Sequence, residues 1–115
     1  YHPANHEQTS NQRLIGPETV GARQMELLLG TLHKGGGALP HAHPGIEQAC
    51  YLLEGSAHVE VGDESFDLVP GDTCFFPADV LHSFTVTSEA PVRLLVFYSP
   101  PYVESPDKVV RESTR

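Results

Sequence analysis

Residues 35–55, GGGALPHAHPGIEQACYLLEG, are the most informative stretch of this chain for its fold and its function. Three glycines and a proline lead to the pair His41 and His43, and Gly55 ends the apolar run that follows. Alternate residues of an extended segment point to the same side, so His41 and His43 can present two imidazoles to one point. The stretch therefore predicts a metal site.

Further ligands are needed from other segments, and the chain offers candidates in two places. In residues 81–87, His82 shares its face with the apolar residue Phe84, which predicts that His82 points into the core. In residues 47–54 neither face is clearly polar. Alternation alone therefore leaves both Gln48 and Glu47 open as the ligand from this segment.

The rest of the sequence has the pattern of an all-β fold. Short apolar runs are separated by Gly and Pro, and no long window has the spacing of an amphipathic helix. Strands are expected at residues 22–33, 38–43, 47–54, 57–62, 65–69, 73–76, 81–87 and 92–99. So many short strands predict a closed barrel or sandwich, because open sheet edges invite aggregation.

Length and charge narrow the class of protein. The 115 residues suit one domain, with residues 13–103 as the barrel, 1–12 as a flexible or exchanged arm and 104–115 as a tail. Fifteen acidic and seven basic residues give a net charge of −8, which argues against nucleic acid or an anionic membrane as a partner. No apolar run approaches the roughly 20 residues of a membrane span.

The cysteines and the start of the chain bear on localisation. Only Cys50 and Cys74 are present, without CxxC spacing, and we expect both to be reduced core residues. The chain begins at Tyr1 and shows no charged-then-apolar leader. Both observations favour a cytoplasmic protein.

Two motifs in order make residues 30–100 resemble the cupin superfamily, in particular its small single-domain members. The first motif, Gly-x5-His-x-His-x(3 or 4)-Glu-x6-Gly, is matched by Gly35, His41, His43 and Gly55. Counting back from Gly55 puts Gln48 at the position of the glutamate. The second motif, Gly-x5-Pro-x-Gly-x2-His-x3-Asn, is matched by Gly71, Pro77 and His82, with Asp79 and Val86 replacing its second Gly and its Asn.

The resemblance implies a cupin double-stranded β-helix, or jelly-roll barrel, that holds one divalent transition metal ion. Its ligands would be His41, His43, Gln48 and His82, with Glu47 as the alternative to Gln48. An amide oxygen leaves the charge of the ion undiminished, which favours an anionic or enolisable substrate. Imidazole and oxygen donors suit Zn, Ni, Fe or Mn, and the sequence does not choose among them.

The implied function is a metal-dependent enzyme acting on a small molecule by isomerase, cyclase or lyase chemistry. The arrangement His41, His43, Pro44, Glu47 and Gln48 is similar to that of small cupins that open unsaturated uronate rings or cyclise aromatic polyketides. A cupin dioxygenase is the nearest alternative. A non-catalytic barrel that binds or senses a small ligand is the second, and a metal-storing or structural barrel is the third.

The sequence assigns no catalytic residue, but it offers several side chains for the mouth of the barrel. Four of them could either bind substrate or serve packing and surface pairing: Tyr51, Tyr98, Arg23 and Arg93. The other histidines are expected in the tails or on solvent faces: His2, His6, His33 and His58. The resemblance also implies a homodimer, with residues 99–102 as a candidate contact.

Overall fold

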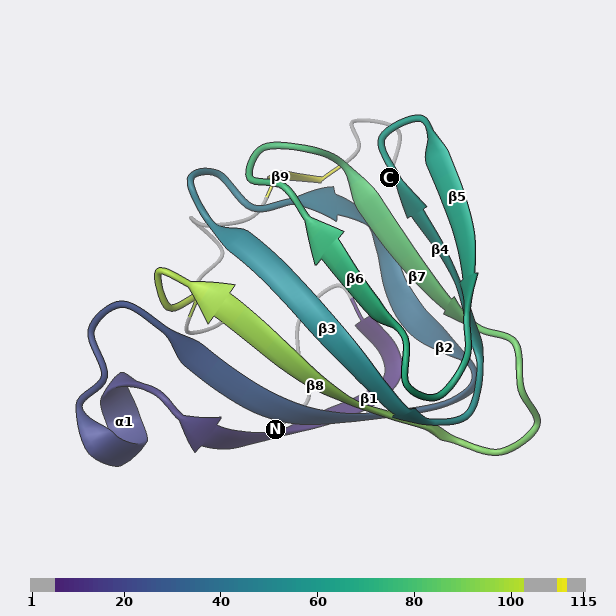
Figure 1. Ribbon diagram of the computed structural model, residues 1–115, viewed down its shortest axis with the longest axis horizontal. Helices are drawn as coiled ribbons and strands as arrows, with labels where there is room; N and C mark the ends of the chain where they lie inside the picture. The colour runs from purple at the N-terminus through teal and green to yellow at the C-terminus, as the bar shows by residue number, and fades with distance from the viewer. Residues whose placement is uncertain (1–5, 103–109, 112–115) are drawn as a thin grey trace.

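The computed structural model describes residues 6–102 and 110–111, and in them the chain is nearly all β (Figure 1). The one short helix in this part of the chain is α1 (Pro17–Val20). The strands are β1 (His6–Ile15), β2 (Glu26–Ala42), β3 (Glu47–Glu54), β4 (Ala57–Val61), β5 (Glu64–Leu68), β6 (Thr73–Phe76), β7 (His82–Val86), β8 (Val92–Ser99) and β9 (Val110–Arg111).

All strands belong to one sheet that curls into a nearly closed barrel. The strand order is β5-β4-β7-β2-β8-β3-β6, and β1 and β9 also pair with β2. The two strands at the ends of this order, β5 and β6, line one surface pocket together. This is the all-β jelly-roll barrel that the sequence predicts, and the prediction is confirmed.

Strand β2 joins the two sides of the barrel. Its residues 26–32 pair with β8, and its residues 37–41 pair with β7. Gly37, at the start of the second part, has φ 141°, and a Cβ built on it would lie 2.0 Å from the Phe84 carbonyl oxygen. Only glycine allows this close approach of the two backbones.

The inward residues of each strand form the core. In β8 the buried positions alternate with more exposed ones, and β7 shows the same alternation at His82, Phe84 and Val86. In β3, Cys50 and Leu52 are buried while their neighbours Tyr51 and Leu53 are exposed. The apolar side of each strand thus faces the interior, and each fully buried large side chain contributes about 1.5–3 kcal/mol.

The predicted strands agree with the observed ones to within about two residues from Glu47 onward. Two features differ. The strands expected at 22–33 and 38–43 are one strand, β2, which runs through the glycines between them and pairs again from Gly37 onward. Residues 6–12, expected in the N-terminal arm, belong to β1, which pairs with β2 from His6 to Ile15. Most of the expected tail 104–115 lies outside the described residues, and the domain boundaries stay a prediction.

Candidate metal centre

Three buried histidines meet where β2 ends and β7 begins. His41 and His82 are direct partners across the two strands, and His43 follows His41 by two positions. Their exposed fractions are 1%, 2% and 4% for His41, His43 and His82. Their candidate ligand nitrogens all lie within 4.8 Å of one another. Three buried imidazoles at this spacing could hold one metal ion, because imidazole is a suitable ligand for transition metals such as Zn, Ni and Fe.

Neighbouring groups fix the histidine rings. His82 Nδ1 lies 3.4 Å from the Val80 carbonyl oxygen, which is the geometry of an Nδ1–H donor that leaves Nε2 as the candidate ligand atom. The ring of His43 meets the rings of Tyr102 and Tyr98 edge-on, at centroid distances of 4.6 and 5.6 Å. These contacts limit the rotation of the rings and hold them beside one another.

Tyr102 owes its place to a buried carboxylate. The backbone N–H of Tyr102 donates to Glu26 Oε1 at 3.0 Å, and the exposed fraction of Glu26 is only 1%. Arg13 Nε lies 3.9 Å from the other carboxylate oxygen of Glu26 and 3.2 Å from Glu18. Glu26 therefore ties the segment after β8 to the start of β2 and holds Tyr102 against His43.

Gln48 and Glu47, the alternatives for the ligand on β3, point in different directions. Both residues border a pocket between β3 and the end of β8, but only Gln48 also lines the cavity with His41 and His82, and Glu47 is exposed. Gln48 Oε1 is buried and has no hydrogen-bond partner among the described residues. A buried amide oxygen without a partner costs about 1–3 kcal/mol, and a metal ion would satisfy it.

The cavity beside the histidines runs through the barrel interior. The empty space along it, part of which is open to solvent, is about 490 Å3. Its walls come from β1, β2, β3, β6, β7 and β8: Thr9, Asn11, Leu32, Ala38, His41, Gln48, Cys50, Phe76, His82, Phe84, Leu94, Val96 and Tyr98. A small molecule suits such a space.

Cys50 faces this cavity, but it is a core thiol. It lies opposite Cys74 across β3 and β6, and both cysteines are free and buried. Burial raises the pKa of the Cys50 thiol to about 12, so the thiol is protonated at neutral pH.

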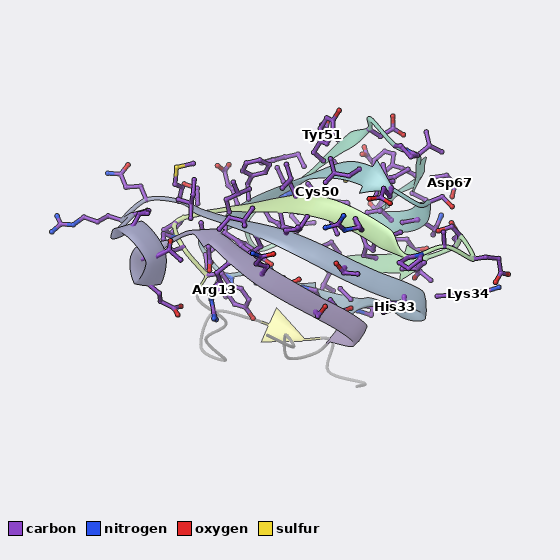
Figure 2. All side chains as sticks on the ribbon, turned by 90° about the horizontal axis from the view of Figure 1, so that it is seen from below. Arg13, His33, Lys34, Cys50, Tyr51 and Asp67 are labelled. Carbon is purple, nitrogen blue, oxygen red and sulfur yellow. The ribbon has the colours of Figure 1, made fainter. Side chains whose placement is uncertain are left out.

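The remaining sequence candidates are spread over the molecule. Tyr98 is buried and lines the cavity, whereas Tyr51 projects outward from β3, as Figure 2 shows. Arg93 pairs with Glu54 on the surface at 3.3 Å. His33 and Arg23 are exposed, and His58 is half-buried; His2 lies outside the described residues, and of His6 only the backbone is described.

Three residues near the centre could not be found from the sequence: Thr9, Asn11 and Tyr102. Thr9 and Asn11 come from β1, whose polar sequence has no apolar pattern that marks an inward face. The ring of Tyr102 contacts the ring of His43, and the backbone hydrogen bond from Tyr102 to Glu26 holds it there. Only the alternation of Thr9 and Asn11 around Ser10 was available as a signal, and it is too short to predict a strand.

The family follows from a match over most of the barrel. A family model described as "Cupin domain" matches residues 28–98, which is more than half of the chain. The chain therefore belongs to the cupin family, and the resemblance seen in the two motifs is confirmed.

Two curated relatives match at the level of sequence. "Polyketide synthase CurC" of Streptomyces cyaneus is 30% identical over 87 residues, which cover 76% of this chain and 56% of that protein. "Protein SchB" of Streptomyces halstedii is 31% identical over 94 residues, covering 82% of this chain and 67% of that protein. The chain thus spans little more than half of the first relative and two thirds of the second.

A solved structure extends the similarity to the whole barrel. The polyketide cyclase RemF from Streptomyces resistomycificus superposes with a TM-score of 0.77 and is 26% identical. The superposition covers 96% of this chain and 74% of RemF. Among the described residues, no helix has the length and apolar character that crossing a membrane requires.

Proposed function

We propose that this cupin is a metal-dependent enzyme that acts on a small, anionic or enolisable organic molecule by isomerase, cyclase or lyase chemistry. The observation that carries the proposal is the group of three buried histidines beside an internal cavity. The relatives named for polyketide synthesis and cyclisation support the same type of reaction. Their names describe those proteins, and the substrate of this chain is a separate question.

We propose His41, His43, His82 and Gln48 as the ligands of one divalent ion, with Zn, Ni, Fe and Mn as candidates. The spacing of the histidine nitrogens, within 4.8 Å of one another, supports the first three. The buried Gln48 Oε1 without a hydrogen-bond partner among the described residues supports the fourth, and the exposure of Glu47 argues against the alternative.

The ion, when bound, would supply a positive centre that stabilises negative charge on a substrate oxygen. The chain itself contributes orientation and a dry site. The Val80 carbonyl holds the proton at His82 Nδ1, and the tyrosine rings hold His43. Phe76, Phe84 and Leu94 make the cavity wall apolar, which lowers the local dielectric constant and strengthens charge interactions there.

The ligand set is tested by metal analysis of the purified protein and its variants. We expect about one ion per chain in the wild type, and a loss of most of it in His82→Ala. Gln48→Ala should bind more weakly by roughly ten- to a hundredfold, whereas Glu47→Ala, altered at the neighbouring exposed position, should match the wild type. Full metal occupancy in His82→Ala would contradict the assignment. If Glu47→Ala alone binds the metal more weakly, then Glu47 and not Gln48 is the ligand from β3.

The reaction class is tested by turnover with unsaturated uronates, β-diketones and phenols, with and without a chelator, while oxygen uptake is recorded. Turnover that stops on chelation and consumes no oxygen supports the proposal. Oxygen consumption would indicate the dioxygenase, and a metal-loaded protein that binds but converts none of the compounds would indicate the binding or sensing barrel.

We also propose a homodimer, formed through the outer face of the sheet. The cross-strand pairs align Leu27, Phe97, Ala49 and Phe75 in one row, and Phe75 and Phe97 are exposed by 53% and 36%. Two copies that each carry −8 repel one another, and this row is free of charge. An apolar contact of this kind suits two copies of the same chain.

A further inference from the structure

The wall of the cavity carries a second, uncharged polar group beside the candidate metal ligands. Thr9 and Asn11 reach the cavity from β1, and the remaining wall contributed by β2, β7 and β8 is largely apolar. Thr9 is 7% exposed. A hydroxyl and a carboxamide in an apolar wall are positioned to recognise a polar atom of a bound molecule.

The sequence makes room for Asn11 with a glycine. Asn11 lies opposite Gly30 in the β1–β2 pair, and Gly30 lies opposite Leu94 in the β2–β8 pair. A Cβ on Gly30 would come within 3.1 Å of Asn11 Oδ1 and 3.0 Å of Leu94 Cδ2. Because position 30 has no side chain, the carboxamide can lie over β2 and face the cavity.

The polar group lines the same cavity as two of the candidate metal ligands, His41 and His82. On β7, Phe84 is two positions from His82, which is about 7 Å along a strand. Phe84 pairs with Ala38 at the bend of β2, where β1 runs alongside, and both residues line the cavity with Thr9. A molecule that fills the cavity therefore contacts both the polar group and the candidate ligands.

The described wall of the cavity contains no Lys, Arg, Asp or Glu. Three of the described cations form ion pairs outside the cavity: Lys34 with Glu89, Arg93 with Glu54, and Arg13 with Glu18 and Glu26. Figure 2 shows Lys34 at the far end of the molecule, extending away from the barrel. A carboxylate or phosphate in the cavity would lose its hydration, and the described wall offers no cation to replace it, which is costly.

We propose that the substrate carries its negative charge only on the group that binds the metal, and that Thr9 and Asn11 bind an uncharged hydroxyl or carbonyl oxygen at its other end. The inference rests on the proposed metal-dependent function and narrows its substrate class. It favours enolisable ketones and phenols over dicarboxylates, uronates and sugar phosphates. It also makes β1 a determinant of specificity.

Three hydroxypyranones with the same metal-chelating head and different substituents at one ring position provide the probes. Allomaltol carries a methyl group there, kojic acid a hydroxymethyl group and comenic acid a carboxylate. Affinities for the metal-loaded full chain are measured by isothermal titration calorimetry. Kojic acid should bind roughly 3- to 10-fold tighter than allomaltol, as one neutral hydrogen bond allows, and comenic acid at least about 30-fold weaker.

Near-isosteric variants assign the effect to β1. Asn11→Leu and Thr9→Val should reduce the advantage of kojic acid over allomaltol to less than about twofold and leave the affinity for allomaltol and the metal content unchanged. Gln12→Leu removes the exposed amide next to Asn11 and should retain the wild-type ratio. Melting temperatures identify any variant that fails to fold, and Asn11→Ser then serves as the milder replacement.

The outcomes separate this inference from the function on which it rests. If comenic acid binds as tightly as allomaltol, a cation reaches the bound molecule and the inference is wrong. If kojic acid keeps its advantage in both β1 variants, Thr9 and Asn11 do not recognise the remote oxygen. If the metal-loaded protein binds none of the three probes, the proposed open metal site is itself wrong, and the inference falls with it.

Discussion

Replacing Gly37 by alanine should destabilise the protein more than the same replacement at Gly35, two residues earlier in the glycine-rich segment. The added Cβ would lie 2.0 Å from the Phe84 carbonyl oxygen and 3.0 Å from its carbon, so the two strands must move apart. Overpacking of this kind costs about 1–3 kcal/mol. The φ of 141°, which an alanine rarely adopts, adds about 1–2 kcal/mol. Together these give a loss of about 4 kcal/mol in the free energy of unfolding.

Gly35→Ala is the matched control. Gly35 also has a positive φ, of 83°, but nothing lies within 4 Å of its added Cβ, so only the conformational cost of about 1–2 kcal/mol applies. At about 4 °C per kcal/mol, the melting temperature should fall by roughly 15 °C in Gly37→Ala and by roughly 6 °C in Gly35→Ala. Urea denaturation should give the same order.

The same substitution should weaken metal binding, because Gly37 and the His41–His82 pair lie on the same β2–β7 ladder. Strands that separate at the Phe84 contact carry the two imidazoles apart. Metal affinity of the folded protein, measured well below the melting temperature, should fall in Gly37→Ala and stay near the wild-type value in Gly35→Ala. Equal melting temperatures for the two variants would refute the steric argument, and an unchanged metal affinity in Gly37→Ala would refute its link to the centre.

Two further predictions concern the surface. The hydrogen bond to Asp67 Oδ1, at 2.9 Å, raises the pKa of His58, and Glu60 adds to the effect. The contribution of His58 to the stability of the fold is therefore complete below about pH 6.5 and is lost as the pH rises through the raised pKa. An NMR titration should show the higher pKa and its return towards 6.5 in Asp67→Asn; identical curves would contradict this reasoning. Phe75→Glu should convert the proposed dimer to a monomer in light scattering, while Val20→Glu on α1 should not; a dimer that survives Phe75→Glu would exclude this face.

The sequence was sufficient for the barrel because its signals are local. Alternation placed Phe84 and Val86 inside with His82, and Gly and Pro marked the turns between strands. The pair His41 and His43 was predicted from the same period of two, and the structure brings His82 to it. Each of these inferences depends on residues that are neighbours in the sequence or share a strand.

What the sequence could not supply depends on contacts between distant segments. Strand β1 forms by pairing with β2 and contains mostly polar residues, so its apolar pattern is too weak to predict it. Tyr102 reaches His43 because its backbone bonds Glu26, which lies 76 residues earlier. No local pattern encodes either contact.

The motif departures show two different physical situations. Asp79 stands where the second cupin motif has glycine, and it adopts φ 66°, the left-handed region that the glycine serves. Its N–H lies 3.2 Å from the His43 carbonyl oxygen, so the turn still reaches the metal centre. Aspartate tolerates this conformation better than most residues, and the backbone geometry of the turn therefore survives the substitution.

Gln48 in place of a glutamate has a chemical consequence instead. An ion held by three neutral imidazoles and an amide oxygen, as proposed, keeps its full double charge inside a wall that has no described acidic residue. A low-dielectric interior makes an unmatched charge costly, so the bound molecule itself must supply the compensating negative charge at the ion. In the proposed function the amide and the uncharged described wall thus act together: the first favours an anionic oxygen at the metal, and the second disfavours a charge elsewhere on the bound molecule.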